Sequence, residues 1–410
     1  MKTTGDQQLV KRINRSVLLR LIRAQPGLSR SQLAGQSGLT KSTVSSAVRE
    51  LITEGWLAEV GDTANANTSG LGRPSTPLRI NACGHGLIGV EVAVDCLRVV
   101  SVSLLGEVLW SAEEPLQNTG PASVCRQAAR LAACGHTELA VRGILLSGVG
   151  IGVPGAFDDT AGVVRFAPNL GWRNVDFVPH ITRALSAAGM SGVPVHIQNE
   201  ADTAALSEYE FAEGESQDAL IFITCDVGVG AGIVLNDRLF TGAQGMAGEI
   251  GHTIIQLDGP LCSCGRRGCA EAFIGARALE RDTARDMAQG ALKSGKSGKS
   301  GKLGQAGRCL GVLIQNLCTT FNPGVLVMGG ASCIRHPELV QIATDTLKAY
   351  AASAGMSLPE VRTARYGLLA AAVGAAALVL HQYLRPMHPR AQGAAALAHA
   401  APQACQPTAA

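Results

Sequence analysis

Residues 219–242, ALIFITCDVGVGAGIVLNDRLFTG, are rich in β-branched and apolar side chains and are interrupted by turn-forming residues. This pattern predicts strands joined by tight turns, because such runs bounded by Gly, Asn and Asp are typical of a meander. Residues 87–110, LIGVEVAVDCLRVVSVSLLGEVLW, repeat the scheme, with Leu105-Gly106 where Asn236-Asp237 stand in the later copy. The repetition predicts two related α/β lobes, each opening with a meander and closing with helices.

A candidate ligand site lies between the two copies, in residues 195–214, VHIQNEADTAALSEYEFAEG. This stretch predicts a strand that ends near Gln198 and a helix that begins around Asp202, with Asn199 and Glu200 between them. Polar residues at the carboxyl end of a strand in an α/β sheet usually face a ligand crevice, and a cleft between lobes is its natural position. The alternative is that both residues merely cap the helix.

Residues 251–273, GHTIIQLDGPLCSCGRRGCAEAF, predict a metal site. One imidazole and three thiolates form a donor set that favours tetrahedral Zn²⁺, and they come from His252, Cys262, Cys264 and Cys269. Four protein ligands leave no open position, so we expect a structural zinc ion. Glu249 and Glu271 flank the ligands, and the zinc ion would fix both carboxylates as acceptors for sugar hydroxyls. The alternative is a reduced, metal-free loop with a chance cluster of cysteines.

The N-terminal part of the chain predicts a DNA-binding head. Residues 1–60 hold nine Lys/Arg and four Asp/Glu, whereas the whole chain has a net charge of only +3. Ser29 and Gln32 form the pattern of a capping box, Gly38 supplies a turn, and Thr40 caps the next helix. The two short helices match a helix-turn-helix. The side chains of the second helix that avoid its apolar stripe are predicted to face the major groove: Lys41, Ser42, Thr43, Ser45, Ser46 and Arg49.

A wing is expected to follow these helices. Residues 55–62 predict one strand and residues 69–80 return as a second, with Arg73 at a Gly-Arg-Pro tip suited to a narrow minor groove. We therefore assign residues 1–80 to a winged helix-turn-helix domain and its linker. The alternative is an ordinary helical hairpin with a solvated polar face and a basic linker.

The rest of the chain divides into an effector domain, residues 81–385, and a disordered tail, residues 386–410, which is rich in Ala, Pro and Gln. Residues 292–304 repeat Gly, Ser and Lys and predict a solvated loop. Residues 366–380 are apolar but shorter than the roughly 20 residues of a membrane span, so a buried helix and no membrane partner are expected. The N-terminus lacks the pattern of a secretory signal, which favours a cytoplasmic location.

Several motifs together resemble the ROK family (repressors, open reading frames and kinases), and in particular its regulators of the xylose-repressor and N-acetylglucosamine-repressor type. The resemblance runs from about Asn14 to His381. Its motifs are GEIGH at 248–252, CSCGRRGCAE at 262–271, GVPGAFD at 152–158, APNLGW at 167–172, NEADTAAL at 199–206 and VLVMGG at 325–330. The fold that it implies is a winged helix-turn-helix followed by two actin-like, ribonuclease-H-like α/β lobes.

The resemblance also implies a set of sugar contacts. Carried over to this sequence, they fall on Asn199, Glu200, Glu249, His252 and Glu271, with Asn169 as a weaker candidate. His252 would then have two roles, with one ring nitrogen on zinc and the other facing the sugar, which a neutral imidazole allows.

Two departures from the family pattern separate this chain from the family's kinases. The kinases approach ATP through an Asp-x-Gly-Gly-Thr loop, whereas residues 91–95 here are EVAVD. Valine blocks close backbone approach to a phosphate, and the Asp95 carboxylate repels it. The kinase's catalytic aspartate is replaced by Glu200, a change that is weak evidence by itself. Together the two changes predict no catalytic residue and no sugar kinase activity.

The expected function is therefore a sugar-responsive regulator of carbohydrate-utilisation genes, most simply a repressor that an aldose releases from operator DNA. Paired heads that read two half-sites imply a homo-oligomer, either a dimer or a tetramer. Two alternatives stay open at this point. One is an ATP-dependent sugar kinase with an appended DNA-binding head, and the other is a DNA-bound factor whose sugar pocket is vestigial.

Overall fold

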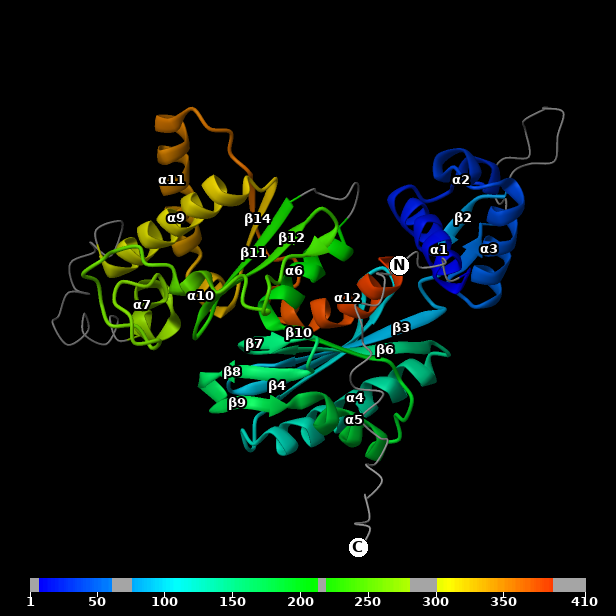
Figure 1. The fold of residues 1–410 in the computed structure, drawn as a ribbon, viewed down its shortest axis with the longest axis horizontal. Coiled ribbons are helices and arrows are strands. Elements are labelled where there is room, and N and C mark those ends of the chain that lie inside the picture. The colour runs from blue at the N-terminus through cyan, green and yellow to red at the C-terminus, as the bar shows by residue number, and fades with distance from the viewer. Residues whose placement is uncertain (1–6, 61–75, 213–218, 281–300, 386–410) are drawn as a thin grey trace, which may run out of the picture.

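A five-stranded sheet forms the centre of each of two lobes, and a small helical head packs beside them (Figure 1). The computed structural model describes residues 7–60, 76–212, 219–280 and 301–385. The first sheet has the order β10-β6-β3-β4-β5 and the second has the order β13-β12-β11-β14-β15. In each sheet the first strand of a meander pairs antiparallel with the next strand and parallel with a later one. The predicted repetition of two α/β lobes is confirmed.

The first lobe runs through residues 85–199. Its elements are β3 (His85–Val92), β4 (Cys96–Ser103), β5 (Val108–Pro115), α4 (Pro121–Val141), β6 (Leu145–Val153), β7 (Ala156–Asp158), β8 (Val163–Ala167), η1 (Pro168–Leu170), β9 (Trp172–Asp176), α5 (Phe177–Ala187) and β10 (Val195–Asn199). Strands β7, β8 and β9 form a separate small sheet. The core of this lobe lies between the large sheet and helices α4 and α5, which is where its apolar side chains are buried.

The second lobe begins at α6 and uses most of the remaining chain. Its elements are α6 (Glu200–Glu210), β11 (Ala219–Cys225), β12 (Val229–Leu235), β13 (Arg238–Leu239), η2 (Ile250–His252), α7 (Glu271–Ile274), α9 (Lys302–Phe321), β14 (Val325–Gly329), α10 (Ala331–Arg335), α11 (Pro337–Ala354), β15 (Glu360–Thr363), η4 (Gly367–Leu369) and α12 (Ala370–Leu384). Asn236 and Asp237 adopt positive φ values of 49° and 65° at the turn between β12 and β13, as the meander pattern predicts.

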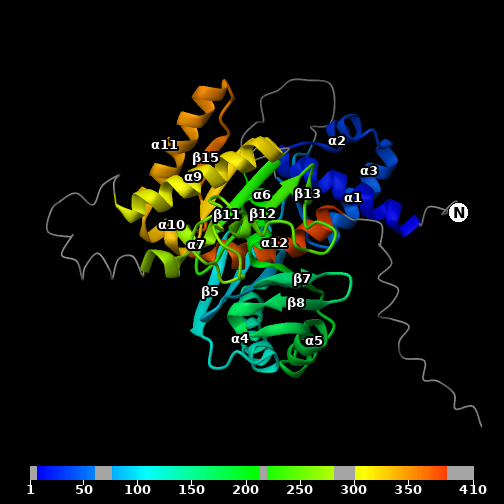
Figure 2. The same cartoon turned by 60° about the vertical axis from the view of Figure 1, so that its left-hand side comes forward.

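Helices α6 and α12 pack against each other between the two sheets (Figure 2). Helix α12 covers β3 and β6, and α6 covers β11 and β12. Their contact is unusually close, because a Cβ atom added at Gly374 would lie 1.6 Å from the Thr203 carbonyl oxygen. The window 367–384 has the length and apolar composition of a membrane span, yet 67% of it is buried in the fold. The prediction of a buried core helix is confirmed.

The head consists of α1 (Gln7–Ala24), α2 (Arg30–Ser37), α3 (Lys41–Thr53) and the antiparallel pair β1 (Leu57–Glu59) and β2 (Leu78–Ile80). Ser29 and Gln32 form the predicted capping box, Gly38 has φ 70°, and Thr40 caps α3. These caps fix where α2 and α3 begin, so the helix-turn-helix is as predicted. The pairing of β1 with β2 forms the base of the predicted wing.

Two predicted boundaries were wrong by a few residues. Helix α6 begins at Glu200 instead of Asp202, because Asn199 is its N-cap. Helix α9 begins at Lys302, inside the predicted loop 292–304. Arg73, the tail 386–410 and residues 292–300 lie outside the described residues.

Candidate functional site

Four predicted metal ligands lie together on the second lobe. Their ligand atoms are all within 4.8 Å of one another, and they belong to His252, Cys262, Cys264 and Cys269. The Cys264 and Cys269 Sγ atoms are 3.7 Å apart, and Cys262 Sγ lies 3.7 Å from His252 Nδ1. A tetrahedron of thiolates around Zn²⁺, with Zn–S bonds of about 2.3 Å, has edges of about 3.8 Å. The cluster therefore fits a tetrahedral metal ion in both chemistry and size.

Tight turns bring these ligands together. Gly265 and Gly268 have φ values of 86° and 75°, and a Cβ atom at Gly268 would lie 1.5 Å from the Gln256 carbonyl oxygen. Arg266 Nε donates to Cys264 Sγ at 3.4 Å. Burial acts to raise the pKa of Cys264, but hydrogen bonds from the backbone and side chain of Arg266 outweigh this effect and lower the pKa to about 6. The loop thus favours a thiolate at Cys264 before any metal binds.

Glu271 and Glu249 lie next to the cluster. Glu271 begins α7, and its Oε1 accepts a hydrogen bond from Ser263 Oγ at 2.8 Å, within the loop that carries the thiols. Glu249 Oε2 lies 4.0 Å from His252 Nε2, the ring nitrogen that faces away from Cys262. Burial raises the pKa of Glu249; His252 opposes this effect and Glu271 adds to it. Both carboxylates are therefore positioned by the segment that holds the thiols and the imidazole.

Asn199 and Glu200 lie where β10 ends and α6 begins. Asn199 Oδ1 accepts from the Ala201 backbone N–H at 2.7 Å, and its Nδ2 donates to the Gly155 carbonyl oxygen at 2.8 Å. The capping role that the sequence left open is therefore present for Asn199. Burial raises the pKa of Glu200 well above its usual value, and the charges of Glu249, Glu91 and Asp226 act in the same direction. The charge of Glu249 therefore acts on Glu200, although the two residues belong to different elements.

Two further carboxylates come from the strand ends of the two lobes. Glu91, at the end of β3, pairs with Arg98 at 3.1 Å, and burial and the charge of Asp226 raise its pKa to about 7 although Arg98 opposes them. Asp226, at the end of β11, accepts hydrogen bonds from Thr224 Oγ1 and from the Ala331 backbone N–H that begins α10. Sequence analysis did not single out Asp226, because its neighbours come from distant segments.

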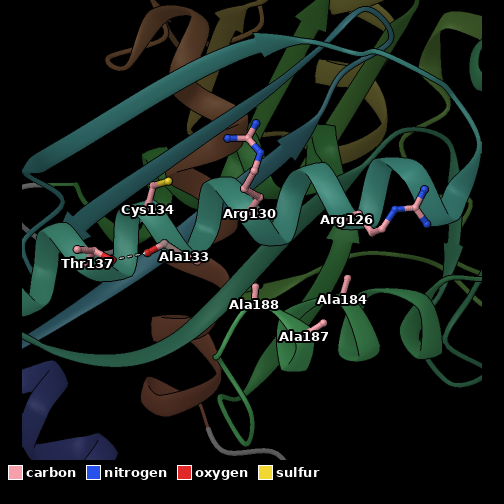
Figure 3. Close-up of a pocket in the computed structure, with 8 residues that line it drawn as sticks. All are labelled: Arg126, Arg130, Ala133, Cys134, Thr137, Ala184, Ala187 and Ala188. Carbon is pink, nitrogen blue, oxygen red and sulfur yellow. Dashed lines mark hydrogen bonds between the residues drawn. The ribbon is translucent and has the colours of Figure 1, made fainter.

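Asn169 lies exposed on the turn η1, and none of the contacts described above involves it. A hollow in the first lobe also lies apart from these residues. It has a volume of about 480 Å³ and is lined by residues of α4, among them Arg126, Arg130 and Cys134, and by Ala184 and Ala187 of α5 (Figure 3). No predicted site residue lines it, so we assign no role to it.

The predicted DNA-reading face lies on α3. Lys41, Ser42, Ser46 and Arg49 are exposed, and Thr43 and Ser45 are half-buried. Within the described residues, neither Lys41 nor Arg49 forms an ion pair, whereas Arg15 and Arg30 pair with acidic residues of the head. The charges of α3 are therefore available to a partner.

Comparisons with known proteins agree with this architecture. A family model described as the ROK family matches residues 137–382, and a model of winged helix-turn-helix DNA-binding domains matches residues 12–58. This chain belongs to the ROK family. The fold is the one expected for it, with a winged helix-turn-helix and two actin-like α/β lobes.

Among ROK proteins, both regulators and kinases are similar to this chain. The xylose repressor of Bacillus subtilis (strain 168) is 29% identical over 93% of this chain and 98% of its own length. A solved ROK transcriptional regulator, a homolog of Escherichia coli Mlc, has a TM-score of 0.72 and 26% identity, covering 92% of this chain and 97% of that one. A ROK glucokinase from Streptomyces griseus, solved with glucose and AMPPNP, has a TM-score of 0.60 and 26% identity over 72% of this chain and 98% of its own.

Proposed function

We propose that this ROK protein is a sugar-responsive transcriptional repressor of carbohydrate-utilisation genes, which binds operator DNA in the cytoplasm and is released by an aldose. The observation that carries the proposal is that one chain joins two parts. A winged helix-turn-helix precedes lobes in which Glu249 and Glu271 lie beside the cluster of His252 and three cysteines. The similarity to a xylose repressor over nearly the full length of both chains supports it and makes xylose the first sugar to test.

The metal in this proposal is a structural zinc ion held by His252, Cys262, Cys264 and Cys269. A bound Zn²⁺ would supply fixed geometry and no open coordination position. The chain's own residues would then bind the sugar. His252 Nε2, which lies 4.0 Å from Glu249 Oε2, would act with the two neighbouring carboxylates, and α6 would contribute the residues at its N-terminal end. The proposed sugar contacts are Asn199, Glu200, Glu249, His252, Glu271 and, more distantly, Asn169.

The DNA-binding part of the proposal assigns base and backbone contacts to Lys41, Ser42, Thr43, Ser45, Ser46, Arg49 and Arg73. Helix α3 has its N-terminal residues exposed, as a recognition helix requires. A repressor of this kind reads paired half-sites, so we propose a homo-oligomer, a dimer or a tetramer. The domain limits that go with it are residues 1–80, 81–385 and 386–410.

The central test follows operator binding while sugar is added. We expect one aldose among xylose, glucose and N-acetylglucosamine to weaken binding of the full chain to DNA from the promoters of neighbouring genes by about 5- to 150-fold, the usual range of allosteric coupling. Fluorescence anisotropy measures the DNA affinity and calorimetry measures the sugar affinity. As a control, R49A should lose DNA affinity and keep its sugar affinity. An operator affinity that no sugar changes would remove the proposed ligand switch.

The second candidate is a sugar kinase, favoured by the similarity to a glucokinase. Residues 91–95, EVAVD, argue against it, because they lack the glycines through which the backbone of the family's kinases approaches a nucleotide phosphate. We therefore expect ADP formation from ATP with glucose, mannose, fructose, xylose or N-acetylglucosamine to equal the sugar-free background in a coupled assay. Turnover clearly above that background would favour the kinase.

A further inference from the structure

Helix α6 joins the proposed sugar site to the DNA-binding head. Its first residue is Glu200, directly after Asn199, and its last residue is Glu210. At a rise of about 1.5 Å per residue, the two glutamates lie about 15 Å apart along the helix. One end of a single helix therefore belongs to the sugar site, whereas the other end lies against the head.

Glu210 is the contact at the head. Its side chain is 2% exposed, and its Oε2 accepts a hydrogen bond from Arg23 Nη1 of α1 at 3.0 Å. Its Oε1 accepts from His381 Nδ1 at 2.6 Å and from Arg385, both of which belong to the end of α12. Burial acts to raise the pKa of Glu210, but the His381 hydrogen bond and the Arg385 charge outweigh this effect and lower the pKa to about 2. A buried, ionised carboxylate thus binds the head and the body together.

A second, more exposed contact lies beside the first. Arg20 of α1 pairs with Asp237 at 3.3 Å, and the Tyr209 hydroxyl donates to the same carboxylate. The guanidinium of Arg385 lies 4.9 Å over the Tyr209 ring. The C-terminal end of α6 and the β12–β13 turn therefore face the same side of α1.

The packing of α6 makes it suited to carry a displacement. A Cβ atom at Gly232 would lie 2.1 Å from the Ala201 carbonyl oxygen, and one at Gly374 would lie 1.6 Å from that of Thr203. Backbones that approach so closely leave no room for side chains to absorb a shift, so a shift of α6 has to carry β12 and α12 with it. By contrast, Trp56 of the head contacts Tyr383 of α12, with ring centroids 4.9 Å apart, and does not involve α6.

We propose that Glu210 is a positioning residue that passes the sugar-bound state of the effector domain to the DNA-binding head, through α6 and the Glu210–Arg23 ion pair. The inference rests on the proposed function, because it takes the N-terminal end of α6 as part of the sugar site. Sugar that draws Asn199 and Glu200 toward Glu249 shifts α6, and the shift changes the orientation of α1. Trp56 also stacks on His85 of β3, with ring centroids 4.5 Å apart, and this contact keeps the head attached to the first lobe while its orientation changes.

The test uses the full chain with Arg23→Gln. This variant removes the positive charge of Arg23 and leaves Glu210 paired with His381 and Arg385, so the body keeps its fold. We expect R23Q to bind sugar and operator with affinities within about threefold of the unchanged chain. We expect the ratio of operator affinities without and with sugar to fall at least about fivefold, toward one. Arg23→Lys, which keeps the charge, should recover part of that ratio.

Arg15→Gln is the matched control, because Arg15 lies on the same helix but pairs with Glu54 inside the head. It should leave the sugar response unchanged. An R23Q chain that responds to sugar as strongly as the unchanged chain would overturn the inference and leave the proposed function intact. If the unchanged chain itself binds sugar without any change in operator affinity, the proposed function fails and this inference fails with it.

Discussion

Replacing Cys269 by serine is expected to remove the metal ion and to weaken sugar binding by about 100-fold or more. Cys269 is fully buried, and its Sγ lies 3.7 Å from that of Cys264. Changes to residues that merely support a metal ligand already cost about 10- to 100-fold in metal affinity, and loss of a ligand costs more. Without the ion, the loop that holds Ser263 and Glu271 loses its fixed shape, so the carboxylates no longer meet the sugar together.

The measurements are metal content by elemental analysis and sugar affinity by calorimetry. The unchanged chain should contain about one zinc ion per chain, and C269S should contain less than about a tenth of that. Cys134→Ser is the control, because Cys134 is an exposed cysteine on α4 outside the cluster, and both measurements should stay unchanged. A zinc-free protein that binds its sugar with full affinity would contradict the proposed role of the ion.

Replacing Gly374 by alanine is expected to lower the free energy of unfolding by about 3 kcal/mol or more. The added Cβ atom would lie 1.6 Å from the Thr203 carbonyl oxygen, which belongs to the backbone of α6 and cannot rotate away. The two helices would have to separate, and the core between the lobes would lose its close packing. Chemical denaturation followed by circular dichroism measures the change.

Gly35→Ala is the matched control for this prediction. Gly35 lies within α2, and a Cβ atom there would meet nothing within 4 Å. Because alanine is the better helix former, G35A should leave stability unchanged or raise it by about 0.5–1 kcal/mol. Equal stability of G374A and the unchanged chain would show that the helices are less tightly packed than the structure indicates.

The features that sequence analysis predicted correctly are local. Ser29, Gln32 and Thr40 cap helices through hydrogen bonds to residues within three positions, and Asn236 and Asp237 form a turn by themselves. The thiols lie within eight residues of one another, so any compact loop brings them together. The alternation of strand, turn and strand was visible for the same reason, because each meander pairs neighbouring segments.

The role of Asn199 shows where local reasoning stops. A polar residue between a strand and a helix can cap the helix or face a ligand, and the sequence is the same in both cases. The structure shows the cap, and also the Nδ2 hydrogen bond to Gly155, which the fold brings from 44 residues away. The predicted start of α6 is two residues late because capping was only one of two interpretations of Asn199.

The sequence by itself therefore determined the caps of the head, the two meanders and the residues that gather into the thiol and imidazole cluster. Only the tertiary structure decided that Glu210 meets Arg23, 187 residues away, and that the charge of Asp226 acts on Glu91 of the other lobe. The close contact of Gly374 with Thr203 belongs to the same class. The physical reason is that a cap, a turn or a chelating loop gains its free energy within a few residues. A buried ion pair or a helix contact gains it only after the whole chain has packed.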